Sequence, residues 1–294
     1  MNTFELAQRP EPAEETTIRE RYRRGFAWPT FVFGLALMVA WLSTTYLAVI
    51  GELSLWLAMP INALLYYGFY TPVHEAAHRN VSGTCQALRW LEDLFGMLCY
   101  LPLASSHHHH RRSHMHHHAY TNRNKDPDIW ARAPTLAEFV LKKMPPQLLG
   151  FFNLAGIWKD CKRLKLTGWQ FWLAVTPTYV CLAIFVSVIA AGYWYELVML
   201  WFIPWWVGMT VLYCFFTWTV HHDHTDTDRY TNTRLSFWPG GYVLLLGQNI
   251  HLIHHMMPSI PFYLYHKACR DLTPILKEKN ARFEGFWPGS SNPR

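Results

Sequence analysis

Charged side chains are scarce in this sequence, and the scarcity is local. Asp, Glu, Lys and Arg make up 16% of the 294 residues, whereas soluble domains contain about 25%. Four long segments contain none of them: residues 27–50, 53–73, 166–195 and 197–220. A helix that crosses a bilayer needs about 20 apolar residues, so each segment is long enough. A single soluble core does not need four such segments, and the sequence therefore predicts an integral membrane protein.

The short loops within each pair of apolar segments lack Lys and Arg. Gly51-Glu52 separates the first pair and the stretch from Gly192 to Glu196 separates the second, which predicts two helical hairpins. All 26 Lys and Arg residues lie before the first span, in the middle segment 74–167, or after the fourth span. Because basic residues mark the cytoplasmic side of a membrane protein, we expect both termini and the middle segment to be cytoplasmic.

Motifs for a built-in redox cofactor are also missing. The six cysteines form no CxxC pair, and there is no haem-attachment motif or glycine-rich dinucleotide fingerprint. An oxidoreductase with this sequence would therefore need a separate protein as its electron donor. The basic residues are scattered among membrane spans and no nucleic-acid-binding motif is present, so we expect no nucleic-acid partner. We divide the chain into a charged cytoplasmic tail, 1–25, and a single membrane domain, 26–294.

Histidine is abundant where the basic residues are. All 17 histidines lie in the middle segment or after the fourth span, on the expected cytoplasmic side. Three sets have helical spacing, which places each set on one face of a helix. These sets are His74 and His78; His114, His117 and His118; and His251, His254 and His255.

Clustered imidazoles at this spacing predict a metal centre. Imidazole is a good ligand for iron, zinc, copper and nickel. The eight histidines of the three sets exceed the needs of one tetrahedral zinc, and they suffice for two metals if His221 or His222 adds another ligand. We favour His222 for that position. His116, His266 and the run 107–110 are expected to be bystanders. The fold that we predict is all-α and integral to the membrane, with four transmembrane helices in two hairpins and a cytoplasmic histidine-rich cap.

Two other functions fit parts of the sequence. His74-Glu75-x-x-His78 matches HExxH, the signature of zinc proteases in which the glutamate is the general base. An intramembrane protease, however, would leave the other six clustered histidines unexplained. A transporter or metal carrier would be expected to have ionisable residues within its spans, and the four apolar segments contain almost none.

Three sequence blocks resemble the membrane fatty-acid desaturase superfamily. They are HEAAH at 74–78, RRSHMHHHAYTNRNKDPD at 111–128 and GQNIHLIHHMMPSIPFYLY at 247–265, and the similarity extends over roughly residues 28–275. The resemblance implies a di-iron site whose ligands are His74, His78, His114, His117, His118, His251, His254 and His255. His221 or His222 occupies the place of the additional ligand. Asp126, Asp128 and Asp226 could orient the ligand rings, and Asn249 could support a ligand or act through a water molecule.

The resemblance also implies chemistry. Enzymes of this kind use O2 and two electrons to oxidise a C–H bond of an apolar lipid, and a ferredoxin-like protein is a suitable donor. Residues 221–234, HHDHTDTDRYTNTR, make the sequence most similar to the desaturase-like bacterial β-carotene hydroxylases. We therefore interpret the protein as a carotenoid-ring hydroxylase of a bacterial inner membrane, with a fatty-acyl desaturase or hydroxylase as the alternative.

Overall fold

Helices dominate the structure. The computed structural model describes residues 12–150, 153–223 and 225–285; the remaining parts of the expected tail and domain, 1–11 and 286–294, lie outside the described residues. The first half contains α1 (Ala13–Tyr22), α2 (Trp28–Val49), α3 (Leu55–Ala77), α4 (Arg89–Tyr100), α5 (His107–Tyr120), α6 (Leu136–Glu138) and α7 (Met144–Gly150). The second half contains α8 (Leu154–Arg163), α9 (Gly168–Ala190), α10 (Trp194–Leu197), α11 (Ile203–Tyr213), α12 (Gly241–Leu244), α13 (His251–Met256) and α14 (Tyr265–Glu278).

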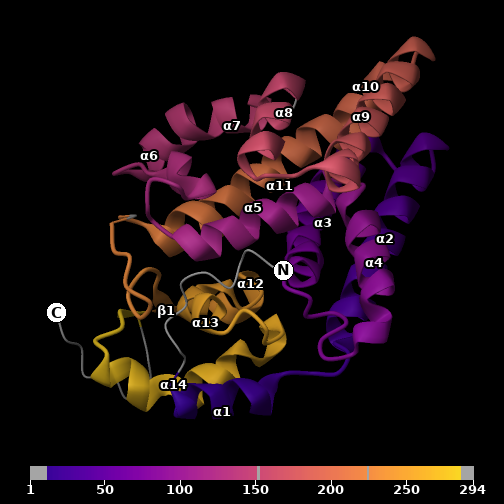
Figure 1. Cartoon of the computed structure of the whole chain (residues 1–294). Helices are drawn as coiled ribbons and strands as arrows, with labels where there is room; N and C mark the ends of the chain where they lie inside the picture. The colour runs from indigo at the N-terminus through magenta and orange to yellow at the C-terminus, as the bar shows by residue number, and fades with distance from the viewer. Residues whose placement is uncertain (1–11, 151–152, 224, 286–294) are drawn as a thin grey trace.

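Three helical segments are long and apolar enough to cross a membrane. They are α2, α9 and the continuous segment Trp194–Thr219, in which α10 and α11 are joined and followed by π-helical turns. Their outward-facing side chains are large and apolar, including Trp28, Val39 and Val186. Figure 1 shows α2, α9 and α10 extending away from α13 and α14, to the upper right of the view. Apolar surface of this kind suits lipid, so the candidate spans indicate an integral membrane protein.

The fourth apolar segment of the sequence forms α3, which is not among these three candidate spans. This helix packs against α2, α4 and α11, and most of its second half is buried. It also carries polar side chains such as Asn62, whose amide donates to the Leu200 carbonyl at 2.9 Å. The structure therefore supports three spans by length and composition, one fewer than expected from the sequence.

The turns within the helix pairs lie where the sequence predicts them. Gly51 separates α2 from α3 with φ of 83°, and Gly192 separates α9 from α10 with φ of 91°. A side chain at either position would be strained in this left-handed conformation, which glycine adopts readily. Each pair therefore reverses direction within a few residues, and the polar ends of α3 and of the Trp194–Thr219 segment return to the same side of the molecule.

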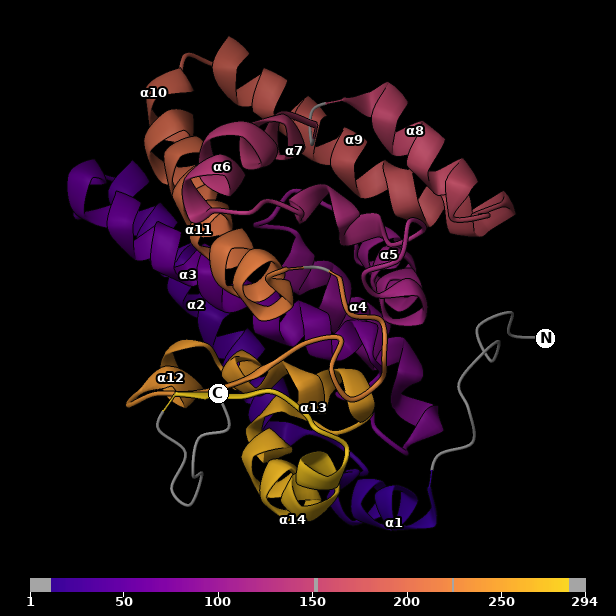
Figure 2. The ribbon, with the colours of Figure 1, turned by 90° about the vertical axis from the view of Figure 1, so that its left-hand side faces the viewer.

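A second layer of structure lies at that side. It contains α12, α13, α14 and two short parallel strands, β1 (Leu235–Phe237) and β2 (Phe283–Gly285). Part of the charged segment that was expected to be a tail belongs to this layer, because α1 packs against α14 (Figure 2). Arg21 pairs with Asp271 at 2.7 Å, and the fully buried Glu15 accepts from Arg229 and Tyr230 at 2.8 Å each.

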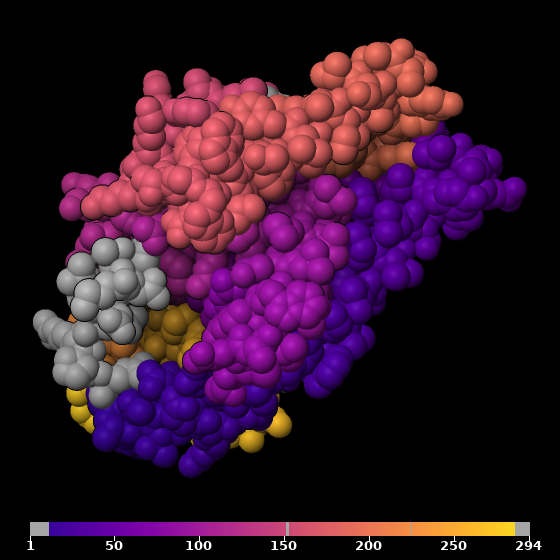
Figure 3. Space-filling model, turned by 45° about the vertical axis from the view of Figure 1, so that its right-hand side comes forward, coloured from indigo at the N-terminus to yellow at the C-terminus, as the bar shows by residue number. Residues whose placement is uncertain are grey.

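Helices α4 and α5 lie between these two layers, and α6, α7 and α8 lie on the opposite side of α5 from α13 and α14 (Figure 2). In the space-filling view α1 and α2 run along the lower and right edges, α9 along the top, and α4 between them (Figure 3). Helix α5 contacts α3, α4 and α9. Helix α5, which is rich in histidine, therefore lies between the bundle of apolar helices and the layer that contains α12, α13 and α14.

Candidate metal centre

Helix α5 carries the longest row of histidines. The hydroxyl of Ser106 caps its N-terminus by accepting a hydrogen bond from the His109 backbone N–H at 3.3 Å. Residues three and four apart on a helix share a face. His114, His117 and His118 therefore point to the same side, toward α3 and α13.

Four imidazoles meet at the end of α3. His74 and His78 come from α3 and its C-terminal cap, His114 from α5 and His254 from α13, and their facing nitrogens all lie within 4.8 Å of one another. Nε2 of His74 is 3.1 Å from Nε2 of His254. Residues separated by up to 180 positions in the chain are thus collected at one point.

A second group of four imidazoles lies beside the first. It contains His117, His221, His251 and His255, again with nitrogens within 4.8 Å of one another. His118 lies between the groups: its Nε2 is 2.9 Å from that of His254 and 3.1 Å from that of His114, and it clusters with His254 and His255. Nine histidines therefore surround two adjacent positions.

Hydrogen bonds to the outer ring nitrogens fix how these imidazoles face. Nδ1 of His117 lies 2.8 Å from Oδ1 of Asp126, and Nδ1 of His251 lies 2.6 Å from Oε1 of Gln248. Both oxygens can only accept, so both Nδ1 atoms donate. In a neutral ring this arrangement leaves Nε2 unprotonated, with a lone pair available for a metal. Nε2 of His251 faces Nε2 of His255 at 3.1 Å.

The lone pairs of facing imidazole nitrogens indicate whether a metal ion fits between the rings. They repel each other unless a cation or a proton lies between them. Burial lowers the pKa values of His114, His118, His254 and His255 well below the usual range, so these rings are neutral at pH 7. Imidazoles that converge on two positions, several of them held from behind by hydrogen bonds, form a donor set that fits two metal ions.

The pKa of His117 shifts in the opposite direction from the pKa values of these four histidines. Burial lowers its pKa, but the carboxylates of Asp126 and Asp128 outweigh burial and raise the pKa to about 8. These carboxylates stabilise positive charge at this ring. They would similarly strengthen a bond from Nε2 to a metal cation, because a carboxylate behind a ligating imidazole increases its basicity.

Comparison with known proteins agrees with this geometry. Residues 50–287 match the fatty acid desaturase family. The chain belongs to this family. No curated protein matches the chain. Family membership makes the protein a membrane di-iron oxidoreductase, with a lipid substrate and an external source of electrons.

The structure of this chain brings together all eight histidines of the three spaced sets. It differs from the sequence interpretation at the additional position. His221 is buried in the second group, whereas His222 packs against Trp218 in a tilted arrangement with ring centroids 4.4 Å apart, and its Nε2 lies 3.5 Å from Oδ1 of Asp223. One residue along a helix rotates a side chain by about 100°, so only one of the two neighbours can face the site.

The carboxylate of Glu75, the glutamate of the HExxH match, is held by hydrogen bonds. The carboxylate of Glu75 accepts from the backbone N–H of Phe262 at 3.1 Å and from the Asn80 amide at 3.3 Å. It also hydrogen-bonds the hydroxyl of Tyr265, which lies 2.9 Å from Nδ1 of His254. Glu75 therefore supports a ring of the first group and is not free to act as the general base of a protease.

Sequence reasoning missed Tyr265 and Gln248 as partners of the histidines. Both belong to the quoted block 247–265, and Gln248 precedes His251 by three residues, which is the spacing that lets them touch. Other suggested partners behave differently. Asn249 donates to the Ser236 carbonyl at 2.8 Å, and Asp226 accepts from the backbone of Asp228.

The run 107–110 divides into separate roles. His107 lies against Asp93, with its Nε2 3.7 Å from the carboxylate, and His109 bonds Asp160 at 2.8 Å. His110 stacks on His114 with ring centroids 5.4 Å apart. None of these three belongs to either four-histidine group among the described residues.

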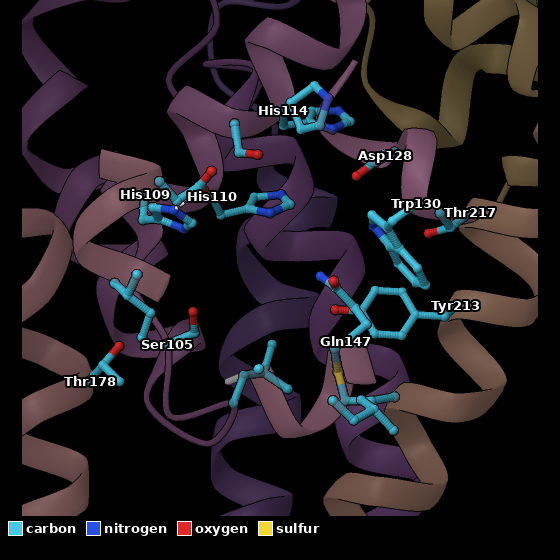
Figure 4. A pocket seen from close by; sticks show the side chains of 18 of the residues that line it. Ser105, His109, His110, His114, Asp128, Trp130, Gln147, Thr178, Tyr213 and Thr217 are labelled. Carbon is cyan, nitrogen blue, oxygen red and sulfur yellow. Dashed lines mark hydrogen bonds and ion pairs between the residues drawn. The ribbon is translucent and has the colours of Figure 1, made fainter. Parts of the chain in front are cut away.

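A cavity of about 420 Å³ reaches the first group of histidines. It lies between α5, α7, α8, α9 and α11, and His114 forms part of its wall (Figure 4). Aromatic and aliphatic side chains line much of it: Tyr70, Tyr100, Leu103, Trp130, Leu148, Trp205, Met209, Leu212 and Tyr213. An apolar molecule in this space would lie next to the imidazoles, which is the arrangement that a lipid oxidase needs.

Proposed function

We propose that the two four-histidine groups bind the two irons of an O2-dependent lipid oxidase. His74, His78, His114 and His254 would hold one ion, and His117, His221, His251 and His255 the other. His118 lies within reach of both positions. The observation that carries this proposal is the convergence of eight imidazoles on two adjacent points, with His117, His251 and His254 held by hydrogen bonds at their outer nitrogens. His221 replaces His222 in this ligand set because of its position in the second group.

We propose a topology of four spans, with α3 as the fourth. Its 23 residues are enough to cross a bilayer, and α2 and α11 cover it, so its polar side chains need not meet lipid. Lys and Arg are absent from the two hairpin turns. By the positive-inside rule, both termini and the histidine-rich layer would face the cytoplasm, in a bacterial inner membrane. Residues 26–294 would form one domain, with 1–25 as its cytoplasmic N-terminal segment.

We propose hydroxylation of a carotenoid β-ring as the reaction. The similarity of residues 221–265 to β-carotene hydroxylases favours it. The aromatic walls of the cavity also suit a flat ring, because Trp130 and Tyr213 meet edge to face at 5.3 Å. Desaturation or hydroxylation of a fatty-acyl chain is the alternative, since an acyl chain also fits an apolar cavity of this size.

The side chains of the protein would perform four tasks in this reaction. Bound iron supplies the activation of O2 that is needed to oxidise an unactivated C–H bond. Asp126, Gln248 and Tyr265 hold the imidazoles in the orientation for metal binding. The aromatic walls bind the substrate and exclude water from the reacting carbon. The side chain of His114, shared between the cavity and the first group, sets how closely the substrate approaches.

Electrons would arrive from a ferredoxin-like protein, because the sequence contains no motif for a redox cofactor of its own. Basic residues of the cytoplasmic face suit an acidic donor, since complementary charge speeds encounter.

Expression in a β-carotene-producing bacterium with a ferredoxin system tests the proposed reaction. Hydroxylated rings with an unchanged fatty-acid profile are the expected result. New double bonds or hydroxyl groups in the membrane lipids, with β-carotene untouched, would replace the lead reaction by the alternative. A His221→Ala strain is the matched control, because it should produce neither product.

A further inference from the structure

The two carboxylates of the sequence Asp126-Pro-Asp128 have different surroundings. Asp126 is buried, and the protein fills its hydrogen bonds: it accepts from Nδ1 of His117 at 2.8 Å, from the Asn122 backbone at 2.7 Å and from the Asp128 backbone at 2.9 Å. It therefore has a complete structural role in holding His117.

Asp128 has no such set of partners. Its nearest polar contact is Nδ1 of His117 at 3.5 Å, and that atom is already bonded to Asp126. The carboxylate accepts no hydrogen bond from the described residues, and 35% of its side chain is exposed. Figure 4 shows it pointing into the cavity from the wall that also carries Trp130. The exposed part of Asp128 therefore belongs to the space that would hold the substrate.

A pure hydrocarbon, β-carotene included, is a weaker match for this wall than a lipid that carries a hydroxyl group. Placing it against Asp128 would strip water from a carboxylate without supplying a hydrogen-bond donor, which is costly. A hydroxyl group would satisfy the carboxylate with a charge-assisted hydrogen bond. The rest of the wall near Asp128, including Trp130 and Tyr213, is aromatic and suits the apolar part of the same molecule.

A hydroxyl group bound to Asp128 would lie in the same cavity that reaches the metal centre. His114 and Asp128 line the same cavity, and His114 belongs to the first group of imidazoles. A lipid whose hydroxyl is fixed on Asp128 would have its neighbouring carbons confined between the aromatic walls and the histidines. Asp128 would thus determine both which lipid binds and which carbon is presented.

We propose that this cavity binds a lipid that already carries a hydroxyl group, and that Asp128 accepts the hydrogen bond from that hydroxyl. This goes beyond the proposed function, because it holds whether the lipid is a ring or an acyl chain. β-Carotene would then be accepted less well than a carotenoid whose ring already carries a hydroxyl group, and a reaction that hydroxylates the same lipid would supply the preferred substrate.

Matched ligand pairs test the proposal by binding rather than by turnover. The pairs are β-ionone with 3-hydroxy-β-ionone and stearate with 12-hydroxystearate, titrated into the iron-loaded protein in detergent with tryptophan fluorescence as the readout. In at least one pair the hydroxylated member should bind the wild type about tenfold more tightly. Asp128→Leu, compared with the wild type at equal measured iron content, should abolish that preference, and Asp128→Asn should retain a reduced preference.

Asp160→Asn is the control within the same cavity. The Asp160 carboxylate is already paired with His109 at 2.8 Å and with Arg163 at 2.5 Å, so this change should leave the preference for a hydroxyl unaltered. Equal binding within both pairs by the wild type would overturn the proposal, as would a preference that survives in Asp128→Leu.

The two pairs also separate this proposal from the proposed ring chemistry. A hydroxyl preference confined to the acyl pair would remove the carotenoid assignment and leave the role of Asp128 standing. Equal binding of both ionones together with equal binding of both acyl ligands would support an apolar cavity and overturn the role of Asp128. If Asp128→Leu fails to fold, the wild-type comparison and Asp128→Asn still decide.

Discussion

The hydroxyl of Tyr265 lies 2.9 Å from Nδ1 of His254, and the same hydroxyl bonds the carboxylate of Glu75. This chain of contacts joins the HEAAH segment at the end of α3 to the histidines of α13. The fully buried Tyr265 thus fixes a ring that faces His74 and His118.

Removing that hydroxyl should weaken metal binding. We expect Tyr265→Phe to lower iron affinity roughly 10- to 100-fold, the usual effect of losing a partner behind a ligating imidazole. Iron remaining after dialysis against a graded series of chelator concentrations measures this effect. Tyr263→Phe is the control, because Tyr263 is only partly buried and has no contact with the histidine groups among the described residues. Equal iron retention by the two variants would show that Tyr265 does not position His254.

Glu75→Gln distinguishes an oxidase from a protease. Glutamine keeps a carbonyl oxygen that can accept from the Phe262 N–H, so the protein should fold, bind iron and retain part of its lipid-oxidising activity. A general base replaced by an amide would lose its activity entirely. The measurement combines iron content with product formation. Complete loss of turnover with full iron retention would contradict the supporting role that we assign to Glu75.

Adjacent histidines provide a sharp test of the ligand set. His221→Ala removes a ring from the second group and should reduce iron from about two ions per chain to about one, with loss of activity. His222→Ala removes a ring that packs against Trp218, and should leave iron content and activity largely unchanged. Metal analysis of both purified variants gives the answer. The reverse pattern would restore His222 as the ligand.

Metal content itself is the fourth prediction. Protein produced with ample iron should contain about two irons per chain, because two separate groups of four imidazoles are available. Removal of the iron by a chelator should lower the unfolding temperature, since a metal that binds only the folded state stabilises it. A single tightly bound zinc without iron would contradict the di-iron assignment and favour the protease alternative.

The sequence by itself determined the chemistry of the centre. Helical spacing alone places His114, His117 and His118 on one face, and the scarcity of charge in 27–50, 166–195 and 197–220 is enough to indicate membrane helices. These properties depend on short-range geometry and on transfer of side chains from water to lipid, which neighbouring residues settle locally.

Tertiary structure decided what depends on contacts between distant segments. Only the folded chain shows that His221 contacts His117, His251 and His255, whereas His222 contacts Trp218. Asp126 and Asp128 look alike in the sequence, yet one is enclosed by hydrogen bonds and the other opens onto a cavity formed by α5, α7, α8, α9 and α11. The same holds for α3, whose polar side chains are covered by its neighbours. The direction of a side chain relative to another helix is set by packing across the whole chain, which residue spacing does not contain.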